Sequence, residues 1–222
     1  TLIRDAYGKK PLFYSVNNNI IAFASDIRSL ENIIDCGDIN PLAVESLFKY
    51  RFIYDPLSIY KNVHKLQPGH IIKFTSKNIV LRKWYNLNGL VEGQDNKDII
   101  HKNLRNYFDK AVKRRLISDV DLGVFLSGGL DSSLIVSSLA EQGYSLPCFT
   151  MGFEGASDYY EERPQAERLA KYFGMEHHSF EINEKSILKK IPEILNACDE
   201  PFADTSALPF YMLSKEVSSS VK

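Results

Sequence analysis

The sequence predicts an α/β protein: a mainly antiparallel β piece with short helices, followed by an incomplete doubly wound parallel sheet. After residue 97, short apolar runs alternate with amphipathic segments that end at glycine, as in "GVFLS", "DSSLIVSSLAEQG" and "PCFTMGF". Such alternation is typical of parallel strands joined by helical crossovers. In the first 85 residues, apolar runs instead flank turn formers, as in "PLFYSVNNNIIAFAS", which is typical of a hairpin.

The N-terminal elements follow from local signals. Asp26 can cap a short helix over 27–34, and Asn40 with Pro41 marks the start of a second helix over 41–52. The apolar stripe of that second helix is Leu42, Val44, Leu47, Phe48 and Phe52. Further strands are expected in "LQPGHIIKF", which is entered by a Pro-Gly turn, and in "IVLRKWYNL".

A polar, turn-rich stretch, "NLNGLVEGQDNK", separates the two patterns. We therefore expect a first domain over 1–85, a linker over 86–97 and a second domain over 98–222. The second domain opens with a long amphipathic helix in "KDIIHKNLRNYFDKAVKRRLIS". Its predicted apolar stripe is Ile100, Leu104, Tyr107, Phe108, Ala111 and Leu116.

Composition excludes several classes of function. The chain has 222 residues and a formal net charge of -1, and its lysines and arginines are scattered, so nothing indicates binding to nucleic acid or to an anionic membrane. No apolar run approaches the roughly 18 residues of a membrane span. Three cysteines without a Cys-x-x-Cys pair favour a reducing compartment, and we expect a cytoplasmic protein.

The strongest functional signal is the loop Ser127–Ser133, which follows the first strand of the alternating region. Gly128 and Gly129 lack a Cβ, so an anion can approach the backbone closely. The helix that begins near Asp131 adds free N–H groups and the positive end of its dipole. Together with the hydroxyls of Ser127, Ser132 and Ser133, these groups predict a polyanion site.

The kind of polyanion follows from what the loop contains. It has Asp131 and no lysine, unlike a G-x-x-x-x-G-K-[ST] loop, and it lacks the G-x-G-x-x-G dinucleotide pattern. A carboxylate beside phosphates is expected where Mg²⁺ lies between them. The loop could thus hold the β- and γ-phosphates of ATP as a leaving group while a nucleophile attacks the α-phosphate, which is adenylation.

These residues resemble a known family. "FLSGGLDSS" resembles the PP-loop of the N-type ATP pyrophosphatases, whose fold is of the HUP type, and "FTMGF" and "DEPFADTSALPFYMLS" resemble later parts of the synthetase domain of glutamine-hydrolysing asparagine synthetases. Upstream, "RDAYGKKPLFYS", "FASDIRSL" and "LQPGH" are similar to the end of that family's Ntn-type glutaminase domain, a class II glutamine amidotransferase. The resemblance covers nearly the whole chain.

The resemblance implies a carbon–nitrogen ligase that uses ATP, Mg²⁺ and ammonia released from glutamine to convert aspartate to asparagine through aspartyl-AMP. It implies that Leu126 and Met151 contact the adenine and ribose side of ATP. It also implies that Asp131 binds Mg²⁺ and that a loop of seven residues binds pyrophosphate. Those seven are Ser127, Gly128, Gly129, Leu130, Asp131, Ser132 and Ser133.

The chain also departs from the family pattern. The family's glutaminase uses an N-terminal cysteine nucleophile, whereas residue 1 here is Thr1, so no glutaminase catalytic residue is identified. A Ser-Gly-rich acidic segment that the family carries after the equivalent of "LSKEVSSSVK" is missing too. We therefore expect a fragment without turnover. The sequence leaves a homodimer of the full-length parent open.

Two weaker features remain. His177 and His178 are adjacent on a predicted strand, so their side chains point to opposite faces and a shared zinc ion is disfavoured. Asp199, Glu200 and Asp204 lie in a Pro-interrupted loop, and loops of this kind often carry binding residues. Asp199 and Asp204 are the candidate substrate residues.

Three alternatives to aspartate amidation stay open. The acceptor could be another carboxylate, such as a sugar acid, or the nucleophile could be internal, as in a β-lactam-forming synthetase. The loop could also belong to a non-catalytic module that binds a nucleotide or phosphate.

Overall fold

The computed structural model describes residues 1–17, 20–75, 78–87, 96–155 and 161–221. The chain divides into two compact units. Unit 1 contains Thr1–Gly93 and Leu195–Asp204, and unit 2 contains Gln94–Ile194 and Thr205–Lys222. The chain therefore leaves unit 2 after residue 194, contributes ten residues to unit 1, and returns.

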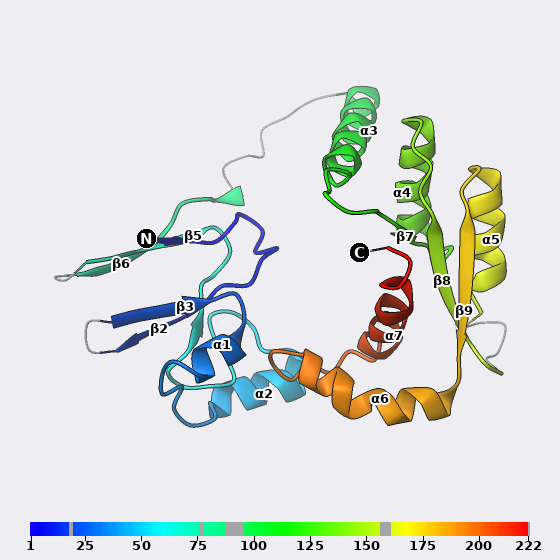
Figure 1. The fold of residues 1–222 in the computed structure, drawn as a ribbon. Coiled ribbons are helices and arrows are strands. Elements are labelled where there is room, and N and C mark those ends of the chain that lie inside the picture. The colour runs from blue at the N-terminus through cyan, green and yellow to red at the C-terminus, as the bar shows by residue number, and fades with distance from the viewer. Residues whose placement is uncertain (18–19, 76–77, 88–95, 156–160, 222) are drawn as a thin grey trace. The chain divides into compact units, whose positions relative to one another are not determined.

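Unit 1 contains two small antiparallel sheets, and its predicted strand-rich character is confirmed (Figure 1). One sheet has the order β1-β5-β6 and the other has the order β3-β2-β4. The strands are β1 (Leu2–Ile3), β2 (Phe13–Asn17), β3 (Ile20–Ala24), β4 (His64–Lys65), β5 (His70–Phe74) and β6 (Ile79–Lys83). Each sheet buries apolar side chains, including Phe13 in one and Ile72 in the other.

The helices of unit 1 begin where the sequence predicts. Asp26 accepts a hydrogen bond from the N–H of Ser29 (2.8 Å) at the start of α1 (Ile27–Glu31). Asn40 accepts one from the N–H of Leu42 (3.1 Å) at the start of α2 (Pro41–Tyr50).

The predicted apolar stripe of α2 is wrong in part. Leu42 and Phe48 are 61% and 84% exposed, and α2 buries Ala43 and Ser46 instead. On this face the Ser46 hydroxyl donates to the backbone oxygen of Phe52 (2.9 Å). The helix also stops before Phe52, since Arg51 takes a left-handed conformation with φ 68°.

Unit 2 contains a parallel sheet with the strand order β7-β8-β9, which confirms the predicted strand–helix alternation (Figure 1). The strands are β7 (Val124–Phe125), β8 (Cys148–Phe153) and β9 (His177–Ile182). The first strand is shorter than "GVFLS" suggested, because only Val124 and Phe125 pair with β8.

Helices pack on both faces of this sheet. Adjacent residues of a strand point to opposite faces, and Cys148 packs with α3 (Lys97–Arg114), α4 (Leu130–Glu141) and α5 (Arg163–Tyr172). Phe149 packs with Leu213 and Val217 of α7 (Ala207–Val217) on the other face. The remaining helix is α6 (Glu184–Ala197).

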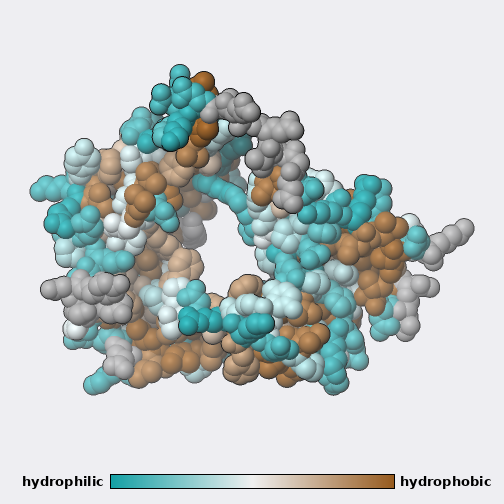
Figure 2. All heavy atoms as spheres, turned by 180° about the vertical axis from the view of Figure 1, so that it is seen from behind, coloured by the Kyte–Doolittle hydropathy of each residue, from teal (hydrophilic) through white to brown (hydrophobic). Residues whose placement is uncertain are grey.

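Apolar side chains also lie on the surface of each unit, as the brown spheres of Figure 2 show. The stripe predicted on α3 is buried only toward its C-terminal end: Phe108 packs against the core, whereas Leu104 and Tyr107 are exposed. Among the described residues, no helix combines the length and apolar character needed to cross a membrane.

Candidate functional site

The loop Ser127–Ser133 lies where β7 ends and α4 begins. Leu126, just before it, is buried, and its N–H donates to the backbone oxygen of Phe149 (2.9 Å). The backbone oxygen of Leu126 accepts a hydrogen bond from the Thr150 hydroxyl (2.5 Å). The loop therefore starts from a residue fixed to β8, at the carboxyl end of the sheet, where open α/β sheets bind ligands.

Hydroxyl groups hold the loop in shape. The hydroxyls of Ser127 and Ser132 lie 3.1 Å apart, and the N–H of Gly129 donates to the Ser127 hydroxyl oxygen (3.2 Å). The Ser133 hydroxyl donates to the backbone oxygen of Gly129 (2.6 Å). The serines that the sequence suggested as ligand donors thus also close the turn on itself.

Gly128 is the residue on which the turn depends. Its φ is +78°, a conformation that side chains with a Cβ rarely adopt. A Cβ placed there would also lie 2.7 Å from Cγ of Gln165 and 3.2 Å from the backbone nitrogen of Ala166. The loop therefore packs directly against the start of α5.

The start of α4 has backbone N–H groups that an anion could accept hydrogen bonds from. The first hydrogen bond of the helix runs from the N–H of Ser133 to the oxygen of Gly129 (3.1 Å). The N–H groups of Leu130, Asp131 and Ser132 precede it, so helix geometry gives them no i−4 partner within α4. Asp131 is exposed in this first turn. Backbone donors, hydroxyls and one carboxylate thus gather over a single helical turn.

Met151, the second residue assigned to the nucleotide, lies near the carboxyl end of β8. Its side chain is half-buried and packs with Phe149 and Phe180 on the α7 face. Leu126 directly follows β7 and Met151 lies in the neighbouring strand β8, while the Met151 side chain also contributes to the core.

Sequence reasoning missed Arg163, which lies over Gly152. A Cβ at Gly152 would lie 2.2 Å from Nε of Arg163, so only glycine leaves room for the guanidinium. Arg163 pairs with Glu161 and with Glu181 of β9 (2.9 Å), and it holds the pKa of the Glu161 carboxyl below its usual value. A glycine inside a strand was the available signal, since it often marks a close approach of this kind.

The two adjacent histidines of β9 make separate contacts, and no cluster suited to a metal ion occurs among the described residues. His177 Nε2 lies 2.9 Å from the Thr150 hydroxyl oxygen, whereas the His178 ring stacks on Phe149 with centroids 5.2 Å apart. Burial lowers the pKa of His177 from its ordinary value of 6.5. His177 therefore braces Thr150, which in turn contacts Leu126.

Stability should fall as the pH is lowered through 6.5, because unfolding lets His177 take up a proton that the folded state binds less readily. The urea midpoint of the wild type should drop more steeply between pH 7 and pH 5 than that of His177→Gln. Expressed as the free energy of unfolding, the wild type and the variant can differ in their dependence on pH by about 1.4 kcal/mol per pH unit. Equal dependence of stability on pH in the two proteins would contradict the assignment. Burial also lowers the pKa of His64, but both proteins contain His64, so its contribution cancels in the comparison.

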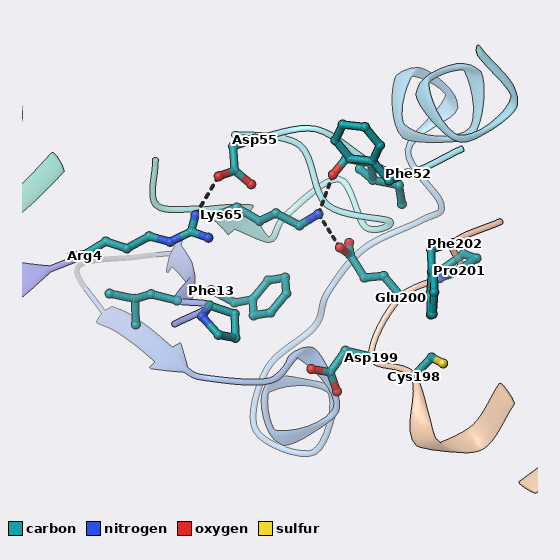
Figure 3. Close-up of a pocket in the computed structure, with 13 residues that line it drawn as sticks. Arg4, Phe13, Phe52, Asp55, Lys65, Cys198, Asp199, Glu200, Pro201 and Phe202 are labelled. Carbon is teal, nitrogen blue, oxygen red and sulfur yellow. Dashed lines mark hydrogen bonds and ion pairs between the residues drawn. The ribbon is translucent and has the colours of Figure 1, made fainter. Parts of the chain in front are cut away.

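The candidate substrate residues Asp199 and Asp204 belong to unit 1. Asp199 forms an ion pair with Arg28 (3.4 Å), and Asp204 is exposed. The residues from Cys198 to Phe202 line a cavity of about 360 Å³ together with Arg4, Phe13 and Lys65 (Figure 3). Glu200, which points toward Lys65 in this view, pairs with that lysine and accepts a hydrogen bond from the N–H of Ile59 (2.7 Å).

Comparison with known proteins places both units in a family. A family model described as "Asparagine synthase" matches residues 103–222, and another described as "Glutamine amidotransferase domain" matches residues 1–85. The chain belongs to the asparagine synthase family. The family resemblance found in the sequence is thus confirmed.

This asparagine synthase family chain is 35% identical over 219 residues to "Putative asparagine synthetase [glutamine-hydrolyzing] 2" of Methanocaldococcus jannaschii, covering 96% of the chain and 42% of that protein. It is 32% identical over 218 residues to "Asparagine synthetase [glutamine-hydrolyzing] 1" of Bacillus subtilis, covering 98% and 34%. The chain thus spans well under half the length of these relatives.

An NMN synthetase from Francisella tularensis is among the similar solved structures. It has a TM-score of 0.37 and 13% identity, and the match covers 57% of this chain and 52% of that chain. A similarity of this extent does not define a fold.

Proposed function

We propose that this chain carries the pyrophosphate-binding part of an ATP-dependent amide synthetase that forms AMP and pyrophosphate, with aspartate as acceptor and ammonia from glutamine as nitrogen donor. The observation that carries the proposal is the loop Ser127–Ser133, whose left-handed Gly128 and free helix N-terminus suit a polyphosphate. The names of the relatives, glutamine-hydrolysing asparagine synthetases, support the choice of reaction.

In the proposed first step, an acceptor carboxylate oxygen attacks the α-phosphorus of ATP. A new P–O bond forms, the bond to the β-phosphate bridging oxygen breaks, and pyrophosphate leaves with the electron pair. The N–H groups of Leu130, Asp131 and Ser132 would stabilise the charge that accumulates on the leaving group. Leu126 and Met151 would contact the adenine and ribose side.

Asp131 fits a Mg²⁺ ion. It offers an exposed carboxylate next to hydroxyls and to the proposed phosphate position, and Mg²⁺ is commonly held by one or two carboxylates together with substrate phosphates. When bound, the ion would neutralise charge on the departing pyrophosphate.

In the proposed second step, the nitrogen of ammonia attacks the acyl carbon, the C–O bond to AMP breaks, and the nitrogen loses a proton to give the amide. We propose that Asp199 and Asp204 belong to the acceptor-binding loop. Since the chain covers 34% to 42% of its relatives, we further propose that these 222 residues alone do not turn over.

The test is ATP–pyrophosphate exchange with Mg²⁺ on the full gene product that carries this sequence, with aspartate, a sugar acid or no acid added. Exchange that requires aspartate supports the proposal. Exchange with only the sugar acid keeps the chemistry and overturns the acceptor, and exchange that is equally fast without any added acid overturns the proposal that a free acid is adenylated. No exchange under any condition overturns the catalytic proposal.

A further inference from the structure

The segment Leu195–Asp204 lies, by sequence, inside the part that matches the asparagine synthase model, yet it packs into unit 1. Two hydrogen bonds, one between backbone groups and one from a backbone N–H to a carboxylate, fix it there. The N–H of Ala203 donates to the backbone oxygen of Arg51 (2.8 Å), and the N–H of Ile59 donates to Oε1 of Glu200 (2.7 Å). Both partners of the segment lie in the region that matches the glutamine amidotransferase model.

A largely buried ion pair secures the same segment. The carboxylate of Glu200 pairs with the ammonium of Lys65, and the side chains are only 11% and 13% exposed (Figure 3). Lys65 also donates to the backbone oxygen of Ile53 (2.8 Å). Each charge is therefore buried with its partner and an additional hydrogen bond, so removing either one alone leaves the other uncompensated.

The place of Glu200 in the chain links this ion pair to the proposed acceptor loop. Glu200 lies between Asp199 and Asp204, the two proposed acceptor-loop residues. Directly beyond them the chain returns to unit 2 and enters α7, which packs on Phe149 of β8. Glu200 therefore holds the loop within unit 1, and the chain continues from the loop into unit 2.

We propose that Glu200 and Lys65 are positioning residues that set the acceptor loop, so that binding of the acceptor carboxylate depends on a lysine of the amidotransferase-like unit. This inference rests on the proposed function. ATP binding, assigned to the loop Ser127–Ser133, should not depend on the pair.

The experiment is a double-mutant cycle in the full gene product with Glu200→Gln, Lys65→Met and the double variant. Glutamine keeps an acceptor for the N–H of Ile59 but removes the charge. Each single variant should raise the KM for aspartate in ATP–pyrophosphate exchange about tenfold or more, with the KM for ATP within about twofold. The double variant buries no unpaired charge and should recover most of the loss.

Hydrogen exchange supplies a second measurement that needs no turnover. The amide of Ala203 should exchange faster in both single variants and return toward the wild-type rate in the double variant. The matched control is the exposed pair Lys61–Asp38 of the same unit (3.1 Å), and Lys61→Met with Asp38→Asn should change neither measurement.

The outcomes separate the two proposals. Faster hydrogen exchange of the Ala203 amide with an unchanged KM for aspartate overturns the positioning role and leaves a structural one. A rise in the KM values for aspartate and ATP alike also overturns it. If the wild type shows no exchange with any acid, the proposed function fails and the acceptor role fails with it, while the amide data still report whether the pair anchors the loop.

Discussion

Gly128→Ala is expected to destabilise unit 2 by about 2–4 kcal/mol and to abolish ATP binding. The alanine would have to adopt φ +78°, and its Cβ would lie 2.7 Å from Cγ of Gln165. Relief of that contact requires the loop to move away from α5, which would turn the backbone N–H groups away from the phosphates. Urea unfolding and calorimetric titration with ATP measure the two effects.

The control for this change is Gly143→Ala. Gly143 has nearly the same conformation, φ +80°, but no atom lies within 4 Å of the added Cβ. It should cost only about 1–2 kcal/mol, the conformational part, and leave ATP binding intact. If Gly128→Ala were no worse than Gly143→Ala in either measurement, packing of the loop against α5 would not shape the proposed site.

Asp131→Ala is expected to reduce ATP–pyrophosphate exchange at least about a hundredfold. Without this carboxylate the site would hold Mg²⁺ poorly, and the charge on the leaving pyrophosphate would no longer be neutralised. Its effect on stability should be below about 1 kcal/mol, since the side chain is exposed and contributes mainly through the helix dipole. Exchange rates and binding of pyrophosphate with and without Mg²⁺ are the measurements.

Asp98→Ala is the matched control, because Asp98 occupies the same position in the first turn of α3. It should reproduce the effect on the helix dipole and leave exchange unchanged. Should Asp131→Ala bind pyrophosphate as well as the wild type and retain full exchange, the loop would be a simple anion binder and the assignment of Asp131 would be wrong.

Local patterns predicted those parts of the fold that local forces decide. Caps at Asp26 and Asn40 fixed two helix starts, and the alternation of strands with glycine-ended helices in unit 2 predicted its parallel sheet. The burial of α2 could not be predicted in the same way. An apolar stripe shows that a helix can bury a face, but Leu42 and Phe48 have no packing partner in the described part of the chain that covers them.

The candidate site likewise has a part that local sequence patterns predict and a part that they do not. The loop Ser127–Ser133 is continuous in sequence, so its glycines and serines identified it directly. The Lys65–Glu200 pair was missed because its two residues are distant in sequence, and charge compensation between distant residues leaves no periodic signal. Arg163 was missed although Gly152, a glycine inside a strand, was a signal of its close approach. In the acidic loop Asp199 and Asp204 were the candidate substrate residues, and the ion pair of Glu200 with Lys65 was not anticipated.

The excursion of Leu195–Asp204 into unit 1 limits how this gene could be divided in evolution or in the laboratory. A single break in the linker would yield an upstream product that retains Lys65 but has lost Glu200, and so carries a buried ammonium without its counterion. Separately encoded halves would then have to reassemble by complementation, with the downstream half donating its ten-residue segment. Recombination that exchanges one half for that of a distant relative should succeed only where residues 65 and 200 are inherited together.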